Sequence, residues 1–344
     1  MSRNRYFMVV ALAAILSTMV FTGAVTGQEE GGILQRVLDR GTLICGVNST
    51  VPGFGFINDA GEASGFDVDF CHAIAAGVLG DANAVQFVPL TAAERFTAVQ
   101  TGAVDVLIRN TTHTLTRDTE NGMDFGPVTF YDGQGLMVRV ADGFASIDDL
   151  GGAAICVLAG TTTELNLADK MAARGLEYEP VVYDTSDATL RALEEGRCDA
   201  LTSDKSQLAG LRSAASDPSL YTILADTLSK EPLGPVYLQG DPQWADVVNW
   251  ITWGTMQAEE FGITSQNIDD FMDSENPEIR RFLGLEEELG AKLGLSNDFM
   301  VNVISQVGNY AEIYERNLFP IGLEVRGLNA LWTEGGAHYP PAWR

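Results

Sequence analysis

The sequence predicts an α/β protein of two lobes, each a mostly parallel sheet flanked by helices, joined by two crossing strands. Two runs of alternating strand-like and helix-like segments carry this prediction, one starting at residue 41 and one at residue 153. Strands that alternate with helices of this length are typical of βαβ units. Extended Gly- and Pro-containing segments at 128–140 and 229–242 separate and follow the second run, so the chain is expected to cross between lobes twice.

Each run gives the same order of elements. In the first, strands are expected at 43–47, 85–90 and 105–110 and helices at 66–80 and 92–102. In the second, strands are expected at 153–158, 178–183 and 198–203 and helices at 162–175 and 186–196. A long helix from Trp244 and an amphipathic helix within 298–317 come later, while the glycine pair at 133 and 135 is interpreted as a flexible turn.

These elements divide the chain into lobes. The first lobe is expected to comprise 28–137 and, after the chain returns, 237–284; the second lobe is 138–236. Residues 285–344 are expected to form a C-terminal extension packed on the first lobe. Two crossing strands would permit hinge bending while limiting other motion.

The N-terminus has the layout of a secretory signal peptide. Arg3 and Arg5 precede a nearly unbroken apolar run from Phe7 to Phe21, and small residues follow. The run is short for a membrane span, so residues 1–27 are expected to be removed by cleavage near 24–27. The sequence therefore predicts a periplasmic location.

The four cysteines suit an oxidising compartment. Of the three possible pairings we favour Cys45–Cys71 and Cys156–Cys198, because each pair then closes a loop within one lobe and leaves the hinge free. The alternative is four buried free thiols. Neither the cysteines nor the three histidines have the spacing of metal ligands, so we expect no metal site and no cofactor.

Charge and motifs exclude several function classes. The formal net charge of −26 disfavours nucleic acid as a partner. The chain contains no GxGxxG after a strand, no GxxxxGK[ST], no GxSxG and no HExxH, so these enzyme signatures are missing. No catalytic residue is predicted.

Polar residues cluster where two predicted strands end. Asn110 through Arg117 follow one strand, and Arg117 carries a planar cation that matches a carboxylate. In an open α/β sheet, ligands bind outside the carboxyl ends of the strands. A helix N-cap loop with a surface ion pair remains the alternative there. The second lobe offers Thr161 to Thr163 at a helix start and Asp204 at a strand end, which could hold an ammonium group or simply cap a helix.

The chain also resembles a known family. In order along nearly all of the mature chain, segments that include SGFDVDFCHAIAAGVLG, ERFTAVQTGAVDVLIRNTTHTLTRD, AGTTTELNLAD and KEPLGPVYLQGD are similar to the periplasmic binding subunit of general L-amino-acid ABC transporters. The resemblance implies a type II periplasmic binding protein fold. It also implies a monomer that closes on a free L-amino acid and delivers it to membrane permease subunits.

The resemblance assigns roles to first-lobe residues. Arg117 matches the arginine that clamps the ligand α-carboxylate, and Asn110 and Thr112 match positions that contact the ligand. Arg95 matches a position that reaches the side chain of acidic ligands, although a surface ion pair is its alternative. Val51 stands where relatives place an aromatic against the ligand, which leaves Phe54 or Phe56 to compensate.

In the second lobe, Thr162 matches a carboxylate donor, Thr161 is its neighbour, and Asp204 matches the aspartate that pairs with the α-ammonium. Recognition of the head group common to all α-amino acids predicts breadth over side chains. The alternative functions are a periplasmic cyclohexadienyl dehydratase, which the fold also resembles, and a chemoreceptor ectodomain, for which the transmembrane helix is missing.

Overall fold

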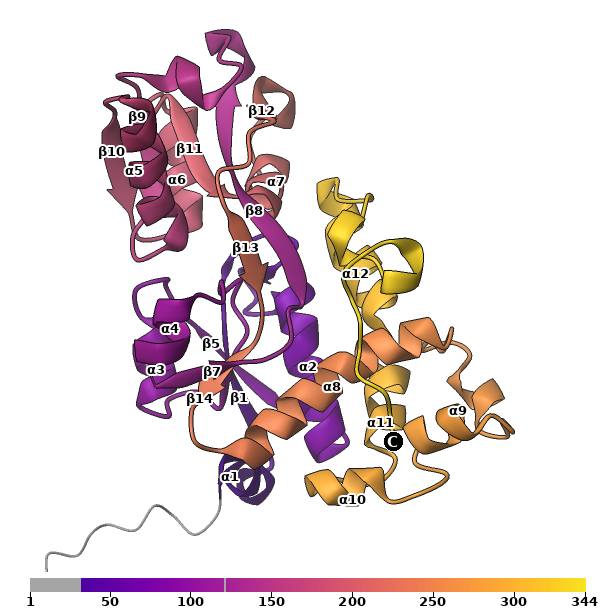
Figure 1. Ribbon diagram of the computed structural model, residues 1–344. Helices are drawn as coiled ribbons and strands as arrows, with labels where there is room; N and C mark the ends of the chain where they lie inside the picture. The colour runs from indigo at the N-terminus through magenta and orange to yellow at the C-terminus, as the bar shows by residue number, and fades with distance from the viewer. Residues whose placement is uncertain (1–31, 121) are drawn as a thin grey trace, which may run out of the picture. The chain divides into compact units, whose positions relative to one another are not determined.

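A computed structural model describes residues 32–120 and 122–344 (Figure 1). The predicted signal peptide, residues 1–27, and its cleavage site lie outside these described residues. Within them, no helix has both the length and the apolar character needed to cross a membrane. Two separate sheets organise the fold, as the two runs of the sequence predicted.

The first sheet has the strand order β5-β1-β6-β14-β7. Three parallel neighbours (β1, β5 and β6) form one side of it, and β14 and β7 extend it in antiparallel pairing. A small sheet, β2-β3-β4, lies beside it. The strands are β1 (Leu43–Val47), β2 (Thr50–Val51), β3 (Gly55–Ile57), β4 (Ala63–Ser64), β5 (Val85–Pro89), β6 (Val106–Leu107), β7 (Met123–Phe125) and β14 (Val236–Leu238). The accompanying helices are α1 (Ile33–Arg40), α2 (Phe66–Leu79), α3 (Arg95–Gln100), α4 (Leu115–Glu120) and α8 (Pro242–Glu260).

The second sheet has the order β10-β9-β11-β8-β12, with β13 also paired to β8. Its parallel neighbours are β9, β10 and β11, and the other pairings are antiparallel. The strands are β8 (Phe130–Arg139), β9 (Ala154–Leu158), β10 (Glu179–Tyr183), β11 (Ala200–Asp204), β12 (Tyr221–Ile223) and β13 (Lys230–Leu233). The helices are α5 (Thr162–Arg174), α6 (Ser186–Glu194) and α7 (Lys205–Ser213), with 3-10 turns η1 (Val140–Asp142), η2 (Ile147–Leu150) and η3 (Pro218–Leu220).

Strands β8 and β13 run between the two sheets as an antiparallel pair (Figure 1). The predicted turn at Gly133 and Gly135 is wrong, because both glycines lie inside the continuous strand β8. Packing explains their presence: a Cβ at Gly133 would lie 2.6 Å from Thr227, and one at Gly135 would lie 2.7 Å from Lys205. The two glycines therefore permit close packing rather than a change of direction.

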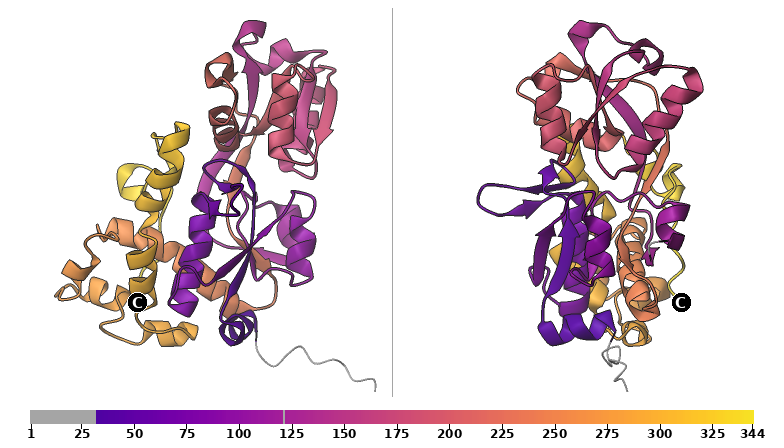
Figure 2. Two further views of the ribbon diagram at one scale, coloured as in Figure 1. Left: turned by 180° about the vertical axis from the view of Figure 1, so that it is seen from behind. Right: turned by 90° about the vertical axis from the view of Figure 1, so that its left-hand side faces the viewer.

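The C-terminal residues form a helical layer on α2 and α8 (Figures 1 and 2). The helix predicted within 298–317 is broken in two, because Gly308 has a φ of 99° and Asn309 begins a new helix with a capping box to Glu312. The elements here are α9 (Pro277–Phe282), α10 (Leu289–Leu293), α11 (Phe299–Gln306) and α12 (Tyr310–Leu318), with 3-10 turns η4 (Ile268–Phe271), η5 (Phe319–Ile321), η6 (Gly327–Asn329) and η7 (Trp332–Glu334).

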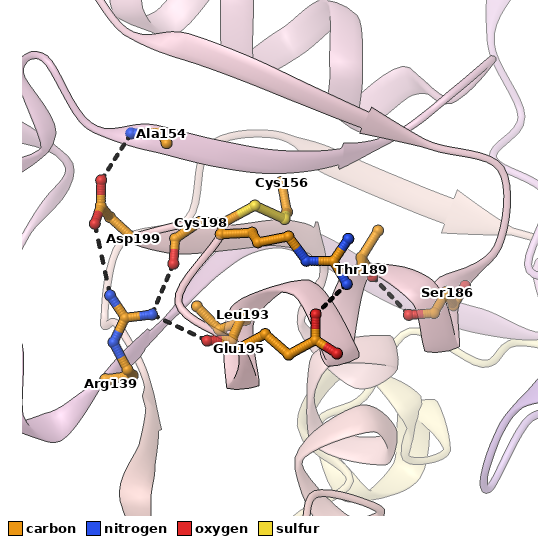
Figure 3. The surroundings of a disulfide bond; sticks show 10 residues. Arg139, Ala154, Cys156, Ser186, Thr189, Leu193, Glu195, Cys198 and Asp199 are labelled. Carbon is orange, nitrogen blue, oxygen red and sulfur yellow. Dashed lines mark hydrogen bonds and ion pairs between the residues drawn. A yellow bond between two sulfur atoms is a disulfide. The ribbon is translucent and has the colours of Figure 1, made fainter.

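Both predicted disulfides are present. Cys45–Cys71 joins β1 to α2, and Cys156–Cys198 joins β9 to the segment just before β11. Figure 3 shows Arg139 beside the second disulfide, where Nη1 donates to the carbonyls of Leu193 and Cys198. Each disulfide therefore joins two neighbouring segments of the same lobe. Neither disulfide links the two lobes across β8 and β13.

Candidate ligand site

One cavity gathers most of the residues that the sequence singled out. Its lining comes from the ends of β6, β9 and β11 and from the first turns of α3, α5 and α7. Six of the seven predicted site residues line it: Arg95, Asn110, Thr112, Thr161, Thr162 and Asp204. Because these strands belong to two different sheets, the cavity lies between the lobes and at the carboxyl ends of their parallel strands.

Arg117, the seventh residue, does not line the cavity but lies next to its wall. Its side chain is 8% exposed, and Nη1 donates to the carbonyl of Thr112 at 2.9 Å. The guanidinium also stacks over the Phe96 ring, 5.0 Å from the centroid. Burial lowers the pKa of Arg117, while the negative charges of Glu231 and Asp204 act to raise it. Arg117 is thus a buried cation that keeps most of its five N–H donors for another acceptor.

Asp204 lies at the N-cap position of α7, yet its side chain makes no capping hydrogen bond. The residue is 6% exposed, borders the cavity and takes part in none of the ion pairs of the described residues. Burial raises its pKa well above 3.8, and Asp132 and Glu231 raise it further. A cationic group in the cavity would relieve this cost by favouring the ionised form.

Thr161 caps the start of α5 with its hydroxyl, whereas the reciprocal half of a capping box with Glu164 is not formed. The hydroxyl of Thr161 accepts from the N–H of Glu164 at 3.1 Å, and Glu164 in return accepts from the N–H of Gly160 rather than from Thr161. Thr162 is the first residue of the helix, so its backbone N–H has no acceptor within the helix. The positive end of the helix dipole therefore points at the cavity that Thr161 and Thr162 line.

Two arginines, Arg95 and Arg109, line the cavity itself. Arg95 is 2% exposed, its Nε has no hydrogen-bond partner, and its guanidinium lies over the same Phe96 ring, 4.8 Å from the centroid. The surface ion pair considered for Arg95 is wrong, because the side chain is buried. Arg109 donates through Nε to the carbonyl of Leu90 at 2.8 Å, and burial lowers its pKa to about 10. Three buried guanidinium groups at one site favour an anionic partner.

The side chain of Asn110 forms hydrogen bonds within the protein. Its amide nitrogen donates to Oε1 of Gln207 at 3.1 Å, which joins the first sheet to α7. Its backbone has a φ of 31°, a left-handed conformation that asparagine tolerates, and its N–H donates to Asp67 at 2.7 Å. Burial raises the pKa of Asp67 to about 7, against the opposing effects of this N–H and of Arg109.

A carboxylate that sequence analysis missed connects the two lobes. Glu231, on β13, is 1% exposed and accepts through Oε2 from the hydroxyls of Thr112 at 2.7 Å and Thr162 at 2.8 Å. Its register partner on β8 is Asp132, whose pKa burial raises to about 6. Both acids sit in the crossing segments, where the sequence indicated only extended chain.

Other missed residues had clearer signals. Arg109 lies within the strand expected at 105–110, and the sequence analysis gave it no role in the site. A charged residue in an otherwise apolar strand is the signal that could have identified it as a buried functional residue. Phe96 is the aromatic ring that packs against Arg95 and Arg117, and neither Phe54 nor Phe56 is among the residues that line the cavity. Phe54 is fully buried against Phe66 and Phe130 and so cannot stack on a ligand.

No group of three or more His, Cys, Asp or Glu side chains is placed to hold a metal ion in the part of the chain that the structure describes. What the cavity offers instead is separated charge: none of the ion pairs found in residues 32–120 and 122–344 involves the three buried arginines or the acids Asp204 and Glu231. Opposite charges held apart around a cavity suit a small ligand that carries both signs.

Comparisons with known proteins agree with this arrangement. Residues 43–261 match the family model of bacterial extracellular solute-binding proteins, family 3. The chain is 48% identical over 337 residues to the general L-amino acid-binding periplasmic protein AapJ of Rhizobium johnstonii, covering 96% of this chain and 98% of that one. It is 45% identical to the glutamate/glutamine/aspartate/asparagine-binding protein BztA of Rhodobacter capsulatus, covering 100% of both.

A solved structure is similar as well. It is an ABC transporter periplasmic binding protein from Brucella ovis with glutathione bound, 49% identical, with a TM-score of 0.88 over 90% of this chain and 99% of that chain. All three relatives are named as binding proteins, and the Brucella ovis protein is named as part of an ABC transporter. The fold, the interlobe cavity and these matches together show that the chain belongs to family 3 of the bacterial extracellular solute-binding proteins.

Proposed function

We propose that this protein binds free L-amino acids of broad range outside the cytoplasm and delivers them to the permease subunits of an ABC transporter. The observation that carries the proposal is that one cavity has both a buried carboxylate that makes no helix-capping hydrogen bond, Asp204, and buried arginines around it. The α-ammonium and α-carboxylate of an amino acid match these two charges. The names of AapJ and BztA, which specify amino acids, support it.

The head group would be held from both lobes. Arg117 would turn its free donors to the α-carboxylate, with the N–H of Thr162 and the positive end of α5 as second-lobe donors. Asp204 would accept from the α-ammonium, and Thr112 and Asn110 would form the first-lobe wall with Thr161 opposite. Closure of the lobes over the ligand would be the state that the permease recognises.

The ligand side chain would extend toward Arg95 and Arg109. Arg95 has an unpartnered Nε, so acidic and amide side chains would gain hydrogen bonds there. Arg109 also borders a second, more open cavity with Glu94 and Asp184, which gives longer side chains room and charges of both signs. Breadth over side chains follows from a fixed head-group site combined with this open end.

The remaining assignments concern processing and layout. Cleavage near 24–27 would release the chain into the periplasm. The lobes would comprise residues 28–137 with 237–284, and 138–236, with 285–344 as the C-terminal extension. The course of β8 and β13 between the two sheets and the contacts of α11 and α12 with α2 and α8 support this division.

Calorimetric titration of an Arg117→Ala variant tests the proposed function. Loss of a charged carboxylate partner is expected to weaken L-amino-acid binding by at least about ten-fold, since hydrogen bonds to charged groups contribute about 1.5–3 kcal/mol. Arg174→Ala is the matched control, because Arg174 pairs with Asp148 on the surface. Full affinity in Arg117→Ala would contradict the clamp. Turnover of prephenate, followed by ultraviolet absorbance, would favour the dehydratase alternative instead.

A further inference from the structure

Glu231 is an unexpected residue to find in a hinge strand. It is buried on β13 and faces Asp132 in register across β8, so two acids lie side by side where the chain crosses between the lobes. Arg117 and Arg95 both feel its charge. Burying a carboxylate costs several kcal/mol unless hydrogen bonds satisfy it.

Hydrogen bonds from both lobes satisfy this carboxylate. Oε2 accepts from the hydroxyls of Thr112 (2.7 Å) and Thr162 (2.8 Å), which come from the end of the first sheet and the start of α5. Oε1 accepts from the amide of Asn166 at 2.9 Å and from the hydroxyl of Ser229. A single side chain on the crossing strand thus joins a first-lobe loop to a second-lobe helix.

The direction of these hydrogen bonds decides what the two threonines offer to a ligand. A hydroxyl has one proton to donate and two lone pairs. A carboxylate can only accept, so the protons of Thr112 and Thr162 are both committed to Glu231. Their mutual contact, Oγ1 to Oγ1 at 3.3 Å, is longer than either bond to Glu231. The hydroxyl oxygens therefore meet the cavity as acceptors and cannot donate to a ligand carboxylate.

We propose that Glu231 is a positioning residue that orients the hydroxyls of Thr112 and Thr162 as acceptors for a ligand ammonium group and ties that orientation to closure of the two lobes. The inference rests on the proposed function, because it assumes an α-amino acid in the cavity. It adds a hinge residue that contacts no ligand yet selects for the amino group. Thr162 then contacts the ligand through two groups: its backbone N–H donates to the α-carboxylate, and its hydroxyl oxygen accepts from the α-ammonium.

Replacement of Glu231 by methionine breaks this arrangement. The methionine side chain is similar in size but has no oxygen, so the hydroxyls of Thr112 and Thr162 both lose the acceptor for their protons. At least one threonine proton is then free to turn toward the cavity. A proton there opposes an ammonium group and favours a carboxylate.

The test compares L-glutamate with glutarate, which lacks only the amino group, by calorimetry on wild-type protein and on Glu231→Met. The wild type is expected to prefer L-glutamate by about 100-fold or more, and this preference is expected to be at least about ten-fold smaller in the variant. A residue that merely supported the fold would weaken the binding of both ligands by the same factor. An unchanged preference in Glu231→Met would therefore overturn the inference.

Two further variants keep the test decisive. Glu231→Leu, which also lacks an acceptor, should show the same loss of preference if the methionine variant fails to fold. Glu177→Gln is the matched control, because Glu177 is exposed and far along the chain from the cavity residues. Failure of wild-type protein to bind L-glutamate would contradict the proposed function itself, whereas wild-type binding with an unaltered preference in both variants would contradict only the role of Glu231.

Discussion

The side-chain amide of Asn329 forms two hydrogen bonds with the backbone of Tyr131: Oδ1 accepts from its N–H at 2.7 Å, and Nδ2 donates to its carbonyl at 3.2 Å. This is the exchange that a paired residue of a neighbouring antiparallel strand would make. Tyr310 adds a hydrogen bond from its hydroxyl to the carbonyl of Thr129 at 2.8 Å. The C-terminal extension thereby fastens the point where the chain leaves the first sheet and enters β8.

An Asn329→Asp variant tests this attachment. The carboxylate still accepts from the N–H of Tyr131 but leaves its buried carbonyl without a donor, so the free energy of unfolding should fall by about 1–3 kcal/mol. Urea denaturation followed by circular dichroism measures the change. Asn83→Asp, at an exposed position, should shift the midpoint little. Equal midpoints for the two variants would show that the amide contributes no net stability.

The disulfides should contribute to stability separately. Cys156→Ala/Cys198→Ala removes a bridge between residues 42 apart in the sequence, and a cross-link of that span is worth about 2–4 kcal/mol. The corresponding double variant of Cys45 and Cys71, which are 26 apart, should lose a similar amount. Denaturant midpoints with and without a reducing agent measure both. An equal denaturant midpoint for the wild type with and without the reducing agent would contradict the prediction.

Asp67 should make stability depend on pH. Burial raises its pKa from 3.8 to about 7, so between these values the folded protein binds more protons than the unfolded chain. Its favourable contribution is complete below about pH 4 and is lost as the pH rises through about 7. Asp67→Asn keeps an oxygen for the N–H of Asn110 and removes the titration. Relative to this variant, wild type should lose on the order of 2–4 kcal/mol between pH 4 and pH 8; parallel profiles would refute the assignment.

Arg95 should act on side-chain preference more than on the head group. Arg95→Met is expected to reduce affinity for L-glutamate at least about ten-fold more than affinity for L-leucine, because only the acidic side chain supplies a partner for the buried guanidinium. Competition of both amino acids against one fluorescent ligand gives the ratio directly. A uniform loss for both would mean that Arg95 supports the cavity without contacting the ligand side chain.

Sequence reasoning succeeded where local pattern and chemistry agree. Asn110 and Thr112 follow a buried strand, and Asp204 ends another, so the rule that parallel strands present their carboxyl ends to ligands brought them together correctly. The helix start expected at Thr161 to Thr163 is a local property of a few residues, and α5 begins there with Thr161 as its N-cap. The disulfide partners followed from their places in the two runs.

The misses share a physical cause. Glu231 and Asp132 lie in extended segments with no helical or alternating pattern. Glu231 is buried, and Asp132 partly buried, only because two lobes and two crossing strands meet there. The sequence alone does not distinguish a glycine in a turn from a glycine in a strand. At Gly133 the deciding feature is tertiary, because the side chain of Thr227 fills the space that a Cβ would occupy. The role of Arg117 as the carboxylate clamp stays a prediction: its guanidinium lies next to the cavity wall and donates to the carbonyl of Thr112.

A calorimetric titration of ligand-stripped protein with a panel of L-amino acids, their D-enantiomers and prephenate tests the proposed function most directly. Several L-amino acids of different side-chain class are expected to bind with dissociation constants below about 10 µM, equivalent to about −7 kcal/mol, and prephenate is expected not to bind. Binding of none of the L-amino acids, or binding of prephenate in their place, would contradict it.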